Sequence, residues 1–86
     1  MLFEISSPAS GRLLDLVDQW SKRYPEDLPL RRALRGLLAD LHADPALIEL
    51  DSEALEAIRS RAADLLAAFP DDRELVLIDA ALTAAV

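Results

Sequence analysis

The chain contains no cysteine, one histidine, two glycines and four aromatic residues among its 86 positions. The absence of cysteine excludes disulfides and thiolate chemistry. The two glycines, Gly11 and Gly36, stand alone, so they cannot form a glycine-rich loop that cradles phosphate. His42 has no second histidine and no Glu-x-x-His pattern beside it, which leaves no metal-binding constellation. We therefore predict no catalytic residue, no metal, no cofactor and no small-molecule substrate, in a protein that is not an enzyme.

Long apolar runs are also missing from the chain. The longest, Leu75 to Val86, covers 12 residues and contains Asp79, so it is too short to cross a bilayer. Residues 1–7 contain no basic leader followed by an apolar core, so no secretory signal is predicted. We expect a cytoplasmic protein that makes no membrane contact.

Leucine and alanine dominate the composition, with 18 and 15 copies. Both residues favour helices, whereas the β-branched and aromatic residues that favour strands are few. The length fits one domain near the small end of those that fold alone. The composition therefore predicts a single all-α domain over residues 1–86.

Two segments with their prolines 45 positions apart share one pattern. Tyr24-Pro25-Glu26-Asp27 is matched by Phe69-Pro70-Asp71-Asp72. An amphipathic run precedes each segment and an apolar run follows it, with Leu30 falling over Leu75. Such self-similarity is typical of a repeated helical hairpin.

The 3.6-residue spacing of the apolar positions predicts four helices. They cover about 8–23, 28–42, 52–69 and 72–85, with residues 1–7 as an N-terminal extension and a short extra helical turn near 45–48. Asp27 is placed to cap the second helix, and Asp71 with Glu74 forms a capping-box-like pair before the fourth. Because the connections are short, neighbouring helices should be antiparallel. The predicted fold is two antiparallel helical hairpins, arranged as a small bundle or as a repeat array.

The hairpin organisation of residues 12–86 resembles tetratricopeptide-like helical repeats, in which a proline and an acid also stand between helices. Gly36 matches the small residue of that repeat's first helix, but Arg32 stands where an aromatic residue is expected. The spacing of 45 also differs from the usual period of about 34 residues. The resemblance implies a scaffold for protein contacts and carries no binding residue over to this chain. A glycine inside a helix costs about 1 kcal/mol relative to alanine, so Gly36 indicates the close approach of another helix.

The negative charge is confined to the second half of the chain. Residues 1–43 carry six acids and six bases, whereas residues 44–86 carry ten acids and three bases, which accounts for the net charge of −7. An acidic surface repels phosphate backbones, so no nucleic-acid partner is predicted. Two interpretations stay open, a surface for a basic protein partner and a solvated face that keeps a leucine-rich chain soluble.

The fourth predicted helix is apolar on almost every side. Three other helices can cover only part of such a helix. Either it is the central helix of the bundle, or another chain covers its far side. We predict an interface formed by its apolar residues, Leu75, Leu77, Ile78, Ala81, Leu82 and Val86.

Charged and aromatic residues give two further hypotheses. Arg31 and Arg35 are candidate contacts for Glu53 and Glu56 of a second copy, with ordinary charge compensation at helix ends as the alternative. Trp20 lies in the middle of the first apolar stripe, which predicts a core anchor. If it were exposed instead, it would be a candidate hot spot for binding.

Together these patterns predict a small acidic protein–protein interaction module, such as an adaptor, a chaperone or an assembly subunit. It would form a homodimer, a larger homo-oligomer or a heteromer through the apolar fourth helix. The alternative is an acidic inhibitor of a basic partner, such as an immunity protein or an antitoxin. A third hypothesis is an acyl or peptidyl carrier, because Asp51-Ser52 at a helix start resembles the phosphopantetheine attachment site of carriers. The residue that follows this serine is Glu53, whereas carriers have leucine at that position.

Overall fold

The computed structural model covers residues 1–86 and contains four helices and two short strands. The elements in chain order are β1 (Leu2–Ile5), α1 (Ala9–Arg23), α2 (Leu28–Asp40), β2 (Ala46–Glu49), α3 (Ser52–Ala68) and α4 (Arg73–Thr83). Each helix begins and ends within two residues of its predicted range. The all-α prediction of two hairpins in a small bundle is confirmed.

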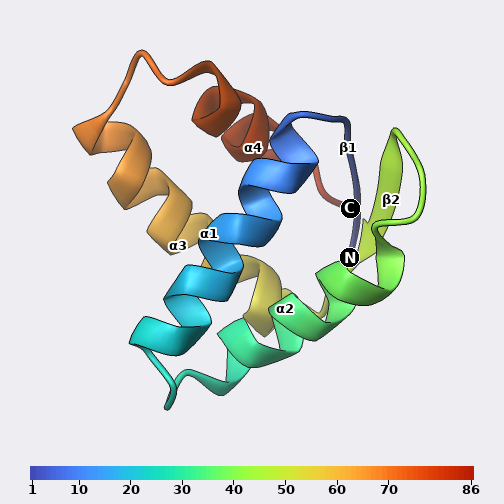
Figure 1. Cartoon of the computed structure of the whole chain (residues 1–86), viewed down its shortest axis with the longest axis vertical. Helices are drawn as coiled ribbons and strands as arrows, with labels where there is room; N and C mark the ends of the chain where they lie inside the picture. The colour runs from blue at the N-terminus through green and yellow to red at the C-terminus, as the bar shows by residue number, and fades with distance from the viewer.

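The four helices form a closed ring beside the small sheet (Figure 1). α1 packs on α2, α2 on α3 and α3 on α4, and α4 returns to contact α1 and β1. The two ends of the chain lie side by side next to the sheet, where Leu2 and Val86 exchange backbone hydrogen bonds. No helix combines the length and the apolar character that spanning a bilayer requires.

Two predictions for the non-helical segments are wrong. Residues 1–7 are not a plain extension and residues 45–48 are not a helical turn, because β1 and β2 pair as an antiparallel sheet. The buried side chains alternate along both strands, with Phe3 and Ile5 inward from β1 and Ala46 and Ile48 inward from β2. This period of two is typical of a half-buried strand. Pairing also satisfies backbone groups that a lone extended segment would leave without partners.

The two proline turns have the same conformation. In the first turn, Tyr24 ends α1 and Asp27 caps α2, accepting a hydrogen bond from the Leu30 N–H at 3.2 Å. In the second turn, the matching residues are Phe69, Asp72 and Leu75, and the capping distance is also 3.2 Å. The repeated sequence therefore specifies a repeated turn, and the prediction that Asp27 is a cap is confirmed.

The capping box predicted for the fourth helix is displaced by one residue. Asp72 caps α4, and Asp71 lies in the turn that follows Pro70. The reason is the repeat itself, since Asp72 is the counterpart of Asp27, whereas Asp71 is the counterpart of Glu26.

The repeat extends to the whole chain, because β1–α1–α2 is followed by β2–α3–α4. All but Leu16, Ala46 and Leu55 of the 19 buried residues fall into pairs 45 positions apart. These pairs are Phe3 and Ile48, Ile5 and Leu50, Ala9 and Ala54, Leu13 and Ile58, Val17 and Ala62, Leu30 and Leu75, Ala33 and Ile78, and Leu37 and Leu82. In the sheet, Phe3 lies opposite Ile48, its own counterpart. An approximate twofold axis therefore passes between the strands.

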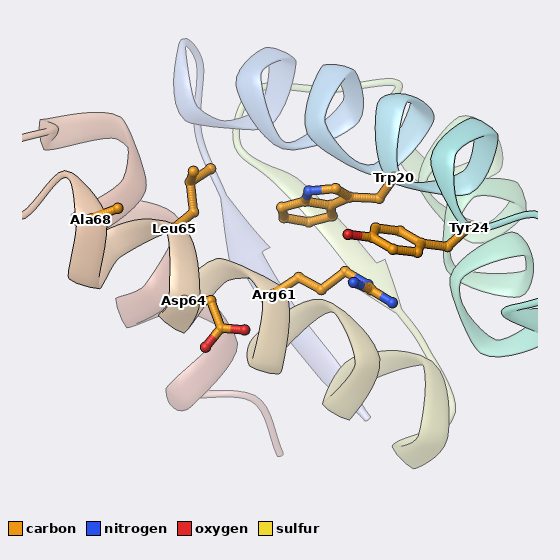
Figure 2. A pocket seen from close by; sticks show the side chains of 6 residues that line it. All are labelled: Trp20, Tyr24, Arg61, Asp64, Leu65 and Ala68. Carbon is orange, nitrogen blue, oxygen red and sulfur yellow. The ribbon is translucent and has the colours of Figure 1, made fainter.

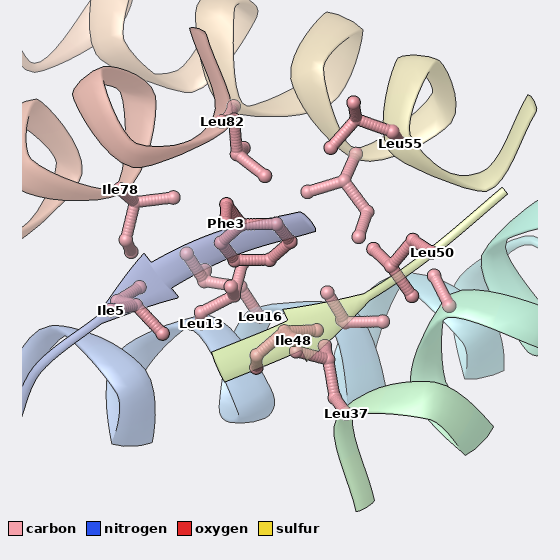
Figure 3. Packing of buried hydrophobic residues seen from close by; sticks show 14 of the residues in the cluster. Phe3, Ile5, Leu13, Leu16, Leu37, Ile48, Leu50, Leu55, Ile78 and Leu82 are labelled. Atoms are coloured by element: carbon pink, nitrogen blue, oxygen red, sulfur yellow. The ribbon is translucent and has the colours of Figure 1, made fainter. Parts of the chain in front are cut away.

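The core forms where the two units meet (Figure 3). Phe3 and Ile48 lie at its centre, with Ile78 and Leu82 from α4 on one side and Leu37 from α2 on the other. The second helix of each unit packs on the strand of the opposite unit, since α2 contacts β2 and α4 contacts β1. No polar or charged residue is buried. The two units thus share one apolar core.

Candidate protein-binding surface

The outer face of the sheet is a surface that no helix covers. Leu2 and Glu4 of β1 and Leu47 and Glu49 of β2 all point away from the core. Leu2 is 40% exposed and Leu47 is 57% exposed. Alternation along a strand places these leucines on the face opposite Phe3 and Ile48, so their exposure follows from the same pairing that builds the core.

The C-terminal part of α4 continues this apolar face. The Leu2 N–H donates to the Val86 carbonyl at 2.6 Å, and the Val86 N–H donates back to the Leu2 carbonyl at 3.0 Å. Two shallow grooves, of about 520 and 360 Å³, border the junction and share Glu4 and Ala81 among their lining residues. Glu4 is the only charged residue that lines either groove.

We call this region the α4–sheet surface. It consists of Leu2, Leu47, Leu77, Ala80, Ala81, Ala84 and Val86. Leu77 is 55% exposed and Val86 is 86% exposed. Isolated exposed leucines are ordinary, but apolar side chains gathered on one surface are typical of a binding site.

The six residues predicted as an interface divide between the core and this surface. Leu75, Ile78 and Leu82 are fully buried in the chain's own core, so they present nothing to a partner, and their assignment to an interface is corrected. Ala81 is partly buried, whereas Leu77 and Val86 are exposed. The spacing of three and four residues turns one side of α4 toward Phe3 and Ile5, which the sequence interpretation had left out of the core.

Leu2 and Leu47 are surface residues that the sequence pattern did not predict. The available signal was the recurrence of Leu2-Phe3-Glu4-Ile5 as Leu47-Ile48-Glu49-Leu50, at the 45-residue spacing of the repeat. Four residues are too few for that signal to be read before the two segments are known to pair.

The charged residues predicted as contacts are divided in a similar way. Arg31 and Arg35 are exposed on α2 and form no ion pair within the chain. Glu53 instead binds Arg32 at 3.0 Å, and Glu56 lies 3.7 Å from Arg59. The two glutamates are therefore already engaged within their own chain.

Arg32 also binds the Asp51 carboxylate at 3.0 Å, and Asp51 is the cap of α3. The Ala54 N–H, followed by the Arg32 guanidinium, lowers the pKa of Asp51 from its ordinary value. Hydrogen bonds to Asp51 and then to Glu53 raise the pKa of Arg32 in turn. This cluster ties the start of α3 to α2.

The ion pairs leave an acidic excess. Five of the nine bases are paired, which leaves Arg23, Arg31, Arg35 and Arg73. The unpaired acids are Glu4, Asp15, Glu26, Asp40, Asp44, Glu49, Asp64, Asp71 and Asp79. Nine unpaired acids against four unpaired bases mean that ion pairs within the chain leave the excess negative charge unneutralised.

The residues considered for chemistry lie at the surface. His42 is exposed in the connector between α2 and β2, and Ser52 is exposed at the first position of α3. No three histidine, aspartate or glutamate side chains gather around a point that a metal ion could occupy.

Trp20 is half-buried at the edge of the core and also lines a groove between α1 and α3 (Figure 2). Its exposure therefore lies between the two alternatives that the sequence left open, a buried core anchor and an exposed side chain.

Comparisons with protein families, with curated protein sequences and with solved structures found no match to this chain. The resemblance to tetratricopeptide repeats therefore stays a prediction.

Proposed function

We propose that the protein is a small, non-enzymatic protein-binding module that uses the α4–sheet surface to associate, first of all with a second copy of itself. An adaptor, a chaperone or an assembly subunit would each work in this way. The proposal extends the prediction of an interface on the fourth helix, with the buried residues removed from it and Leu2 and Leu47 added.

The proposal rests on a comparison of α2 with α4 at positions that the repeat makes equivalent. α2 and α4 occupy equivalent places in the two units, so positions 45 apart meet the same surroundings. Where α2 exposes Arg31, Arg32 and Arg35, α4 exposes Val76, Leu77 and Ala80. The fold accepts arginine at these places in the first unit, so its packing does not require apolar residues in the second. Contact with another protein would explain why these exposed positions of α4 are apolar.

Burial of the α4–sheet surface would stabilise a complex through the hydrophobic effect, at about 25 cal/mol for each Å² removed from water. A stable interface buries about 800 Å² on each partner. The outer face of the sheet and the exposed side of α4 adjoin, so both can contribute to one contact.

The acidic excess supports a second candidate function, an inhibitor that neutralises a basic partner. Such a complex would weaken steeply as salt is added, because its attraction is mainly between exposed charges. Association through the apolar α4–sheet surface should instead tolerate salt. Binding measured at low and high ionic strength therefore separates the two functions.

Sedimentation equilibrium of the whole chain and of Leu77→Arg tests the proposal. We expect the unchanged chain to self-associate at high micromolar concentration and Leu77→Arg to remain a folded monomer. Leu38→Arg is the matched control, because Leu38 is equally exposed on α2, outside the α4–sheet surface. A strict monomer at that concentration would remove self-association from the proposal. An equal loss of association in both variants would show that the α4–sheet surface is not the interface.

A further inference from the structure

A second surface, remote in sequence from the α4–sheet surface, lies between the C-terminal half of α1 and α3 (Figure 2). It is a groove of about 220 Å³ lined by Trp20, Tyr24, Arg61, Asp64, Leu65 and Ala68. Trp20 and Tyr24 extend from α1 toward α3, and Leu65 extends from α3 toward Trp20. Trp20 and Leu65 are counterparts in the repeat, so the groove lies close to the approximate twofold axis.

The one base in the groove is already engaged. The Arg61 guanidinium lies 3.1 Å from the Asp27 carboxylate and 3.7 Å from the centre of the Tyr24 ring. The ion pair with Asp27 neutralises its charge, and stacking on Tyr24 occupies one face of that ring. Arg61 therefore forms part of the groove wall. Because Asp27 neutralises its charge, Arg61 does not make the groove a site for an anion.

The groove also holds polar groups that have no partner in the chain. The Trp20 indole N–H donates no hydrogen bond, and the exposed Asp64 carboxylate forms no ion pair. Leu65 and Ala68 add an apolar wall beside them. Aromatic faces, an apolar wall and a free carboxylate together suit a long side chain that is apolar along its stem and cationic at its end.

We propose that this groove binds a lysine or arginine side chain presented by a peptide segment of a protein partner. The stem lies along Trp20, Leu65 and Ala68, and the cationic end reaches Asp64. The acidic excess of the whole chain favours the approach of such a segment. The proposal does not depend on the α4–sheet surface, and either surface can fail without the other.

Trp20 is the only tryptophan, so its fluorescence reports on the groove in the whole chain. The probe is a ten-residue peptide of alternating lysine and glycine, with the glutamate–glycine peptide as its counterpart. We expect the lysine peptide alone to change the Trp20 emission in a saturable way. Asp64→Asn should weaken its binding by roughly two- to fivefold, as expected for a partly exposed ion pair.

Ala68→Arg and Ala67→Arg form a matched pair of variants. Both residues are exposed in the last turn of α3, where added positive charge favours the helix, but only Ala68 lines the groove. Ala68→Arg fills the groove with its own guanidinium. The affinity of this variant for the lysine peptide should therefore be about three- to tenfold lower than that of Ala67→Arg. The inference would be overturned if Ala68→Arg and Ala67→Arg bound the lysine peptide equally well. It would also be overturned if the unchanged chain bound the glutamate peptide as tightly as the lysine peptide. Leu77→Arg should bind the lysine peptide normally, which separates this test from that of the proposed function.

Discussion

The Asp27 carboxylate joins the two halves of the chain through Arg61. One of its oxygens accepts the Leu30 N–H at the start of α2, and the other lies 3.1 Å from the Arg61 guanidinium of α3. Its counterpart Asp72 makes a similar contact, since Asp72 caps α4 and lies 3.1 Å from Arg12 of α1. Each capping aspartate therefore fixes its own turn and also links that turn to the opposite unit.

Replacing Asp27 should separate the two roles of this residue. Asp27→Ala removes both the cap and the ion pair, and we expect it to lower the free energy of unfolding by about 1–2 kcal/mol. Asp27→Asn keeps an oxygen that can cap α2, so its loss should be smaller, at most about 1 kcal/mol. Urea unfolding measures both values. Equal losses in the two variants would mean that the cap contributes nothing.

The capping aspartates also predict how stability depends on pH. The Leu75 N–H, and after it Arg12, lowers the pKa of Asp72, and the pKa of Asp51 is lowered in the same way by Ala54 and Arg32. Because the pKa of each carboxylate is lower in the folded state, the unfolded chain binds the proton at a higher pH than the folded chain does. The stability they contribute is therefore complete above about pH 4 and is lost as the pH falls through the folded-state pKa values.

Thermal unfolding between pH 7 and pH 2 tests this dependence. Asp51→Asn and Asp72→Asn should each show a shallower loss of stability with acid than the unchanged chain. Asp71→Asn removes the same charge from the neighbouring position, which caps no helix, and serves as the control. If Asp72→Asn lost stability with acid as steeply as Asp71→Asn, the role assigned to the Asp72 carboxylate would be contradicted.

The division of α4 into a buried and an exposed side predicts opposite outcomes for two neighbouring leucines. Leu75→Ala removes a side chain that is fully buried, so it should cost about 2–5 kcal/mol of stability. Leu77→Ala changes an exposed side chain and should alter stability by less than about 0.5 kcal/mol. Denaturant unfolding at low micromolar concentration, where association is weak, checks both values. A large loss for Leu77→Ala in the monomer would place Leu77 in the core.

The two glycines should respond differently to alanine. A Cβ at Gly11 would meet no atom within 4 Å, so Gly11→Ala should stabilise the chain by about 0.5–1 kcal/mol. A Cβ at Gly36 would lie 2.8 Å from a methyl carbon of Leu50 and 3.4 Å from the Glu49 carbonyl oxygen. Gly36→Ala should therefore be close to neutral, because a shift of the Leu50 side chain offsets the gain in helix propensity. Thermal unfolding compares the two, and an equal gain at both positions would show that Leu50 moves freely.

Gly36 also shows how far the sequence could lead. A glycine inside a helix correctly indicated a close approach, but the approaching element is the segment at the end of β2 and not another helix. The composition of the chain gave no reason to expect a strand there. Neither strand is stable alone, and each depends on a partner more than 40 residues away in the chain.

The sequence by itself determined the helices and the turns between them. Apolar spacing set the four helices, and the repeated Pro-acid-Asp segments set two equal turns, because helix periodicity and capping act over only a few residues. Tertiary structure decided which side of α4 is covered. Burial of Leu75 and Ile78 and exposure of Leu77 depend on where β1 and α1 lie, and those positions arise only when the two units pack around one core.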